Sequence, residues 1–174
     1  FITAHDLAPE SARRAIAFTS DDSLRTFVEL AGGGRDSLES LLRGRDVALY
    51  SWLVRAFTPG DAREAQVRLA PDGRVIGVSR ILPDSLVRPS VSDTAGRLMA
   101  DSVLTQWLGE PNGRWTLLAS SYVTRKPSDR IDRTYTYERT GRTISDAPLR
   151  LDVVIAGDLV ATAIISIAIM AIAT

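Results

Sequence analysis

The 174-residue sequence predicts an α+β fold of two units, in which helices precede an antiparallel β-meander and pack on its sheet. Apolar residues recur at helical spacing over residues 24–31 and 95–108. From Val47, and again from Trp115, apolar and polar residues alternate instead, and turns rich in Gly, Pro or Asp separate the alternating runs. Helical signals thus come before strand signals in both halves, which indicates a structural repeat.

Three helices are predicted in the first unit. Residues 9–19 begin with Pro and carry Ile16 and Phe18 on their apolar side, which predicts a short amphipathic helix. Two Asp and one Ser supply N-cap candidates for the helix over residues 24–31, and a third helix is predicted over residues 36–44. The three glycines between the second and third helices follow a helix instead of a strand, so they predict a helix end and not a phosphate-binding loop.

Strands follow the helices in both units. Alternation around Trp52 predicts the first strand, and a Pro-Asp-Gly turn at residues 71–73 predicts a β-hairpin after it. In the second unit, Ser92 or Asp93 is the expected N-cap of a helix, and three alternating runs come next. A Gly-Asp turn at residues 157–158 then predicts the return of a closing strand.

The chain is predicted to contain five segments. In chain order they are the N-terminal helices of the first unit (1–46), the first meander (47–84), the helix of the second unit (85–113), the second meander (114–165) and an apolar tail (166–174). The chain ends in an uncharged run that begins at Leu159. That run is shorter than the roughly twenty residues that a membrane-spanning helix needs, so it is at most the start of an anchor. Its first part continues the hairpin at residues 157–158 and is predicted to be the closing strand.

Composition excludes several classes of functional site. Acidic and basic residues number 21 each, so the formal net charge is zero and the charge balance does not indicate a nucleic-acid surface. The chain has no cysteine and one histidine, His5, which excludes disulfides, thiolate nucleophiles, a zinc triad of histidines and a pair of histidine haem ligands. His5 precedes the first predicted helix and is expected to be exposed. We therefore predict no catalytic residues, no cofactor and no metal site.

A cluster of charges in the second meander is the candidate interaction surface. Its members are Arg125, Asp129, Arg130, Asp132, Arg133, Glu138 and Arg139. One interpretation is cross-strand ion pairing on a solvated sheet face, where each exposed pair contributes about 0.2 to 1 kcal/mol. The other interpretation is a polar contact surface for another protein.

Five aromatic residues allow two interpretations. Trp52, Trp107, Trp115, Tyr135 and Tyr137 have the residue types that line many ligand pockets. Trp52 and Trp107 lie on the apolar faces of their own predicted elements, so core packing is the favoured interpretation.

Three stretches of the chain resemble a known family. They are WLVRAFTPGDAREAQVRLAPDGRVIGVSRILPD (52–84), RKPSDRIDRTYTYE (125–138) and LRLDVVIAGDLV (149–160). Together they resemble the N-terminal soluble, extracytoplasmic region of bacterial intramembrane proteases of the CAAX-processing and bacteriocin-protection (CPBP) type. Arg133 stands where that pattern has a histidine. The catalytic Glu-Glu motif of those proteases is missing from this chain, so the resemblance implies a non-catalytic domain beside a membrane.

The function predicted from these observations is that of a non-catalytic accessory or structural subunit. We expect it to dock by protein–protein contacts onto an integral membrane complex, for example a photosynthetic or respiratory assembly, at the periplasmic face of a bacterial inner membrane. The alternative is a substrate-recognition or regulatory domain of a CAAX-type intramembrane protease. A third possibility, a small-molecule binding protein, would require a sizeable cavity between sheet and helices, and no such ligand is predicted.

Overall fold

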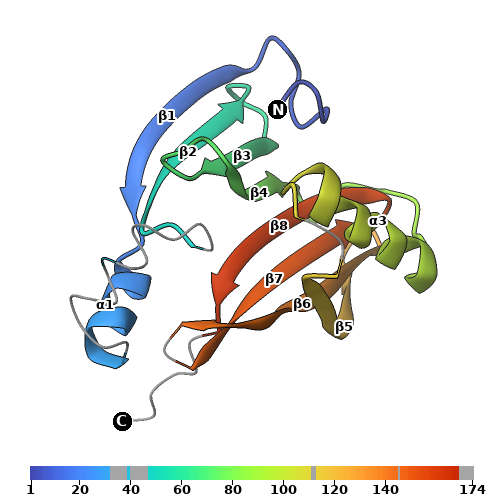
Figure 1. The fold of residues 1–174 in the computed structure, drawn as a ribbon. Coiled ribbons are helices and arrows are strands. Elements are labelled where there is room, and N and C mark those ends of the chain that lie inside the picture. Colours follow the sequence, from blue (N-terminus) through green and yellow to red (C-terminus); the bar gives the residue numbers. More distant parts are fainter. Residues whose placement is uncertain (32–38, 40–46, 111–112, 145, 169–174) are drawn as a thin grey trace.

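A single antiparallel sheet of eight strands, in the order β1-β2-β3-β4-β8-β7-β6-β5, organises the protein. The computed structural model describes residues 1–31, 39, 47–110, 113–144 and 146–168. Figure 1 shows β1 on one outer rim of the sheet, and α3 lying across the strands of the second half.

Eight strands and two helices make up the regular structure of the described residues. In chain order they are β1 (Arg13–Ser20), α1 (Asp22–Ala31), β2 (Tyr50–Phe57), β3 (Glu64–Leu69), β4 (Val75–Ile81), α3 (Asp93–Gln106), β5 (Trp115–Arg125), β6 (Arg130–Ile144), β7 (Ala147–Ala156) and β8 (Leu159–Ile167).

Two four-stranded meanders build the sheet and meet at its centre. Strands β1 to β4 pair in sequence order, as do β5 to β8, and the two meanders join where β4 pairs antiparallel with β8. The joining ladder is short, since its register covers only Gly77–Ile164, Val78–Ala163 and Ser79–Thr162. The two halves therefore need further contacts to hold their relative position.

The second meander contains the larger core. Along β7, every second side chain from Leu149 to Ile155 is fully buried, as the alternating sequence predicts. Helix α3 covers this face and packs Ala100 and Val103 against it. Ser92, one of the two predicted N-cap residues of α3, is confirmed, because its hydroxyl accepts a 3.2 Å hydrogen bond from the Ala95 backbone N–H.

The predicted α+β class is wrong, because the protein is mainly β, with about half of its residues in strands. One continuous sheet replaces the two separate sheets, and only α3 lies on a sheet face in the described part of the chain. Over the first meander, the irregular N-terminal segment takes the place of the predicted helices, and its Leu7 packs against Ala56, Val67 and Val78.

The predicted helix over residues 9–19 is also wrong, since most of it forms β1. Ile16 and Phe18 alternate with Ala15 and Ala17, a period of two that suits a strand, and Phe18 pairs directly with Trp52 of β2. Pairing with β2 decides between the helix and the strand, because an isolated helix of this length is marginal in water.

Other predicted elements are confirmed. Helix α1 begins after Asp21, whose carboxylate accepts a hydrogen bond from the Leu24 N–H at 2.9 Å. The hairpins at residues 71–73 and 157–158 form, and β8 starts at Leu159 as expected. The helix predicted over residues 36–44 falls almost wholly outside the described residues.

Close packing between α3 and β6 leads to a first prediction. A Cβ atom added at Gly96 would lie 2.5 Å from the hydroxyl oxygen of Tyr135, a fully buried side chain. We expect Gly96→Ala to lower the free energy of unfolding, since overpacking costs up to about 3 kcal/mol whereas replacing a helical glycine gains about 1 kcal/mol. Urea denaturation measures the difference.

Two variants control this prediction. Thr94→Ala, at an exposed position of the same helix, should change stability little. In a Tyr135→Phe background the Gly96→Ala change should cost less, because the nearest atom, the hydroxyl oxygen, is gone. An equal cost in both backgrounds would contradict the proposed contact.

Candidate interaction surface

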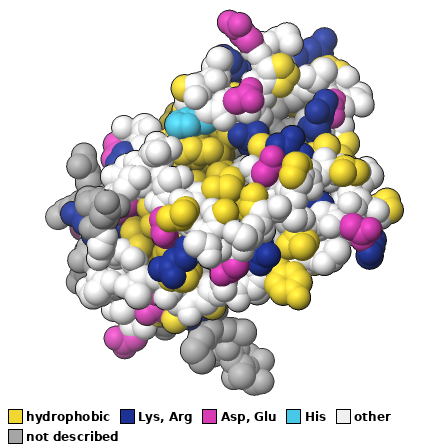
Figure 2. All heavy atoms as spheres, turned by 90° about the vertical axis from the view of Figure 1, so that its right-hand side faces the viewer, with side chains coloured by type: hydrophobic (Ala, Val, Ile, Leu, Met, Phe, Trp, Pro, Cys, Tyr) yellow, Lys and Arg dark blue, Asp and Glu magenta, His cyan; other side chains and the backbone are white. Residues whose placement is uncertain are grey.

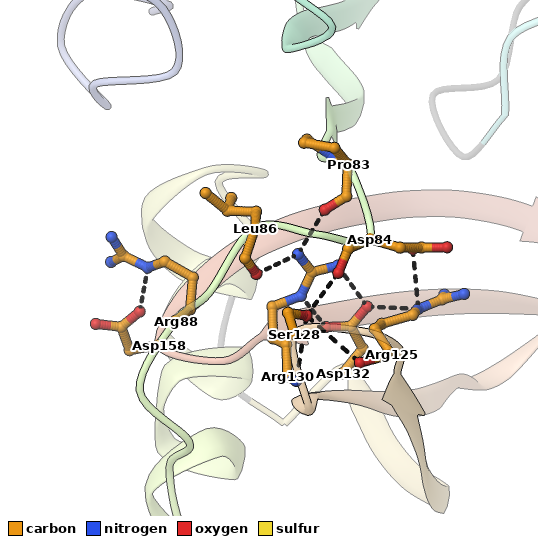
Figure 3. A network of polar contacts seen from close by, with 9 residues as sticks. All are labelled: Pro83, Asp84, Leu86, Arg88, Arg125, Ser128, Arg130, Asp132 and Asp158. Carbon is orange, nitrogen blue, oxygen red and sulfur yellow. Dashed lines mark hydrogen bonds and ion pairs between the residues drawn. The ribbon is translucent and has the colours of Figure 1, made fainter.

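Two members of the predicted charge cluster form a buried ion pair instead of a solvated face, and the more exposed Arg125 side chain joins them in one network. Arg130 is 2% exposed and Asp132 is 7% exposed. The Arg130 guanidinium donates to both Asp132 carboxylate oxygens, at 2.7 and 3.1 Å, and to the carbonyls of Pro83 and Leu86, at 3.0 and 3.1 Å. Arg125 donates to the same carboxylate at 2.8 Å. Figure 3 shows these groups converging from the β5–β6 hairpin and the segment after β4.

This network joins the second meander to the segment that connects the two meanders. Pro83 and Leu86 belong to the segment that leads from β4 to α3, and Arg130 opens β6. Farther along the same segment, Arg88 donates to Asp158 in the β7–β8 turn at 2.7 Å. The segment runs so close to that turn that a Cβ on Gly157, which has a φ of +63°, would lie 2.5 Å from the Arg88 Cβ.

The electrostatics of Asp132 favour its charged form. Burial raises the pKa of this carboxyl group, but the hydrogen bonds from Arg130 and Arg125 outweigh burial and hold the pKa below its ordinary value. Asp132 is thus a carboxylate whose charge the fold itself stabilises.

The other four members of the cluster lie on different parts of the sheet. Strand alternation puts Arg133 and Arg139 on the face that α3 covers, and Glu138 on the opposite face. Arg133 donates to the Val91 carbonyl at 3.3 Å near the start of α3. Asp129 pairs with Lys126 in the β5–β6 turn.

The two remaining charges make longer contacts. Arg139 lies 3.5 Å from Glu110, and Glu138 lies 3.8 Å from Arg150. The seven residues therefore do not gather into one surface. Most of their contacts join different segments of the chain.

Three of the five predicted core aromatics are confirmed. Trp115, Tyr135 and Tyr137 are buried. The Tyr137 hydroxyl donates to Asp101 of α3 at 2.7 Å. Burial, and to a lesser extent this hydrogen bond, raises the pKa of Tyr137. Trp107 is half-buried, where it contacts the His5 ring at a centroid distance of 5.3 Å, so His5 is less exposed than expected.

Trp52 is the exception, because it lies on the surface with three other apolar side chains. We call this set the aromatic patch. Its members and their exposed fractions are Ile16 (66%), Phe18 (53%), Tyr50 (41%) and Trp52 (43%).

The patch is an ordered cross-strand cluster on β1 and β2. The Phe18 ring stacks on Tyr50, with centroids 5.8 Å apart and an 8° angle between planes, and it lies 4.8 Å from the Trp52 ring. Aromatic cross-strand pairs of this kind stabilise a sheet. The sequence-based prediction missed the patch because it assigned Ile16 and Phe18 to a helix, although the period-two alternation of β1 was present.

The side of the molecule turned away from β1 has a different character. Figure 2 shows basic and acidic side chains interspersed there with smaller hydrophobic areas. A hollow of about 430 Å³ lies between the N-terminal segment and strands β2 to β4, with Leu7, Ala65 and Arg80 in its lining. It lies outside the sheet–helix interface where a small-molecule cavity was considered.

The described residues contain neither a metal-ligand cluster nor a helix that could span a membrane. Their His, Asp and Glu side chains do not gather in threes as metal ligands would. Neither of their two helices has the length and apolar character that crossing a membrane requires.

The buried network leads to a second prediction. Arg130→Met leaves the Asp132 carboxylate buried with fewer partners, and losing one member of a buried ion pair costs about 3 to 5 kcal/mol of stability. Lys126→Gln, which removes an exposed pair in the same hairpin, should change the free energy of unfolding little. Denaturant melts compare the variants, and equal effects would contradict a structural role for the network.

A third prediction concerns pH. The pKa of Asp132 is lower in the folded state than its unfolded value of roughly 3.9, so its contribution to stability is complete above that pH and is lost as pH falls through the folded pKa. We expect the stability difference between the wild type and Asp132→Asn to be constant near neutral pH and to shrink below about pH 4. Urea melts at several pH values test this, and a difference that grows in acid would contradict it.

Comparison of the chain with protein-family models, with curated proteins and with solved structures found no match. The resemblance to the CPBP soluble region therefore stays a prediction, and functional inference depends on the surfaces described above.

Proposed function

We propose that this protein is a non-catalytic docking domain, an accessory subunit that binds another protein through the aromatic patch. The exposure of Phe18 and Trp52, two large rings that contact each other at the β1–β2 rim of the sheet, is the observation that carries the proposal. Exposed apolar clusters on monomers mark interaction sites, and aromatic residues dominate the binding energy of many interfaces.

The physical state of the patch supports this role. Its rings are already ordered against each other on adjacent strands, so binding would freeze few additional rotamers. In contrast, Arg130 and Asp132 already bond to each other within the chain. Breaking this contact to bind a partner would leave a buried charge unpaired, which is costly. The aromatic patch is therefore the better docking surface.

We assign the docking to an integral membrane complex at the periplasmic face of a bacterial inner membrane, on the basis of the sequence resemblance to a domain that stands beside a membrane. The contact itself is between proteins, so it requires a partner with an apolar surface that matches the patch.

A purification experiment tests the proposal. The tagged full-length protein is isolated from detergent-solubilised membranes of its native host, and the mass and stoichiometry of the complex are determined. We expect a discrete complex with a membrane protein. Phe18→Ser and Trp52→Ser should each weaken it about 30-fold, the equivalent of a 2 kcal/mol hot spot.

Leu98→Ser is the matched control, since Leu98 is also a large exposed apolar residue but lies on α3. It should leave the complex intact. Recovery of the wild-type protein alone, or equal losses in all three variants, would overturn the proposal. Binding to protein-free lipid vesicles with the same dependence on Phe18 would assign the patch to lipid instead of protein.

A further inference from the structure

Among the described strands, β1 has an outer edge that is open for strand pairing. In that part of the chain β1 is terminal in the sheet and pairs only with β2 (Figure 1). The Asp21 N–H donates to the Leu49 carbonyl of the neighbouring chain segment at 2.8 Å. In an antiparallel strand, the backbone N–H and C=O groups of successive residues point alternately to the two neighbouring edges. Ala17, four residues before Asp21, therefore also points its backbone groups at β2, whereas Ile16 and Phe18 point theirs at the open edge.

The side chains along this edge do not protect it. From Ala15 to Ser20 the strand has no charged residue and no proline, which are the usual means of blocking an edge. Two of the residues whose backbone groups point outward, Ile16 and Phe18, also expose large apolar side chains. An added strand would thus bury apolar surface and satisfy backbone hydrogen bonds at the same time.

The edge is complementary to a second copy of itself. An antiparallel copy related by a two-fold axis at Ala17 pairs residues that lie symmetrically about that position. Ile16 then faces Phe18 of the second copy, and both members of this pair direct their backbone groups across the new edge.

The charges at the two ends of β1 match in the same register. Arg13 faces Asp21 of the second copy, so a basic strand start meets an acidic strand end. Arg14 faces Ser20 of the second copy, next to Asp22, and no ion pair within the described residues uses Arg13 or Arg14. A parallel arrangement would instead place these arginines together, which is unfavourable.

We propose that the chain forms a homodimer by antiparallel β1–β1 pairing about a two-fold axis at Ala17. The pairing continues the sheet from one copy into the other and keeps equivalent faces on the same side. The two aromatic patches then become one continuous surface. The dimer goes beyond the proposed docking function, and its test requires no docking partner, so the two proposals can fail separately.

Cysteine cross-linking tests the register, because the natural chain has no cysteine. At a two-fold axis the two copies of residue 17 form a non-hydrogen-bonded pair with Cα atoms about 4.5 Å apart, within disulfide range. Ala17→Cys should therefore form a disulfide dimer on mild oxidation of the full-length protein, seen on a non-reducing gel.

Ala15→Cys is the matched control. Ala15 is also an exposed alanine on the same face of β1, but its two copies would lie about 13 Å apart along the paired strands. That separation exceeds the range of a disulfide bond, so this variant should stay monomeric on the same gel. Equal cross-linking of both variants would reveal random collision or another register and would overturn the proposal.

Sedimentation of the uncross-linked protein gives the second readout. We expect the wild type to be a dimer and Ile16→Lys to be a monomer, since a lysine on the open edge opposes strand addition. Circular dichroism checks that the variant keeps its fold. A monomeric wild type at every concentration, or a dimer that Ile16→Lys leaves unchanged, would overturn the proposal.

Discussion

The position of the two meanders depends on the buried ion pair between Arg130 and Asp132. The ladder that joins β4 to β8 covers few residues, so contacts outside this ladder also help to fix the relative position of the halves. Arg130 adds hydrogen bonds to the carbonyls of Pro83 and Leu86, in the segment that connects the halves. A neutral side chain could not satisfy two carbonyls and a carboxylate together, which explains why a charge is buried here.

The charge cluster and the aromatic patch thus differ in their contacts, because the first bonds within the molecule and the second is exposed. The charged residues of the second meander hold the linker and the start of α3, whereas four apolar side chains of β1 and β2, the aromatic patch, are exposed. Charge alone would favour the second meander as the contact region. The exposure of Phe18 and Trp52 favours the rim of the first meander instead.

The proposed docking and the proposed dimer use different parts of β1. Docking uses the aromatic side chains on the sheet face, and dimerisation uses the backbone groups at the strand edge. Pairing two edges would enlarge the face available to a partner, since both patches would lie on the same side of one sheet. Interfaces gain affinity when a few aromatic residues are held rigidly, and a continuous sheet provides such rigidity.

Local patterns identified α3, the strands of both meanders and their tight turns. Ser92 could be recognised as an N-cap and the alternation from Leu149 to Ile155 as a buried strand, because each signal depends only on neighbouring residues. The helix predicted over residues 9–19 failed because Ile16 and Phe18 fit weak helical and weak strand patterns alike. The arrangement of the charge cluster could not be predicted for a related reason, since sequence shows that a residue is charged or aromatic but not whether another segment covers it.

Composition and local patterns therefore account for the neutral charge, the lack of cysteine chemistry and the order of most elements. Tertiary contacts place both meanders in one sheet, bury Arg130 and leave Trp52 exposed. Local patterns could not reveal this, because strand pairing and burial depend on contacts between residues far apart in the chain. The pairing of β4 with β8 and the path of the segment from Pro83 to Arg88 are contacts of this kind.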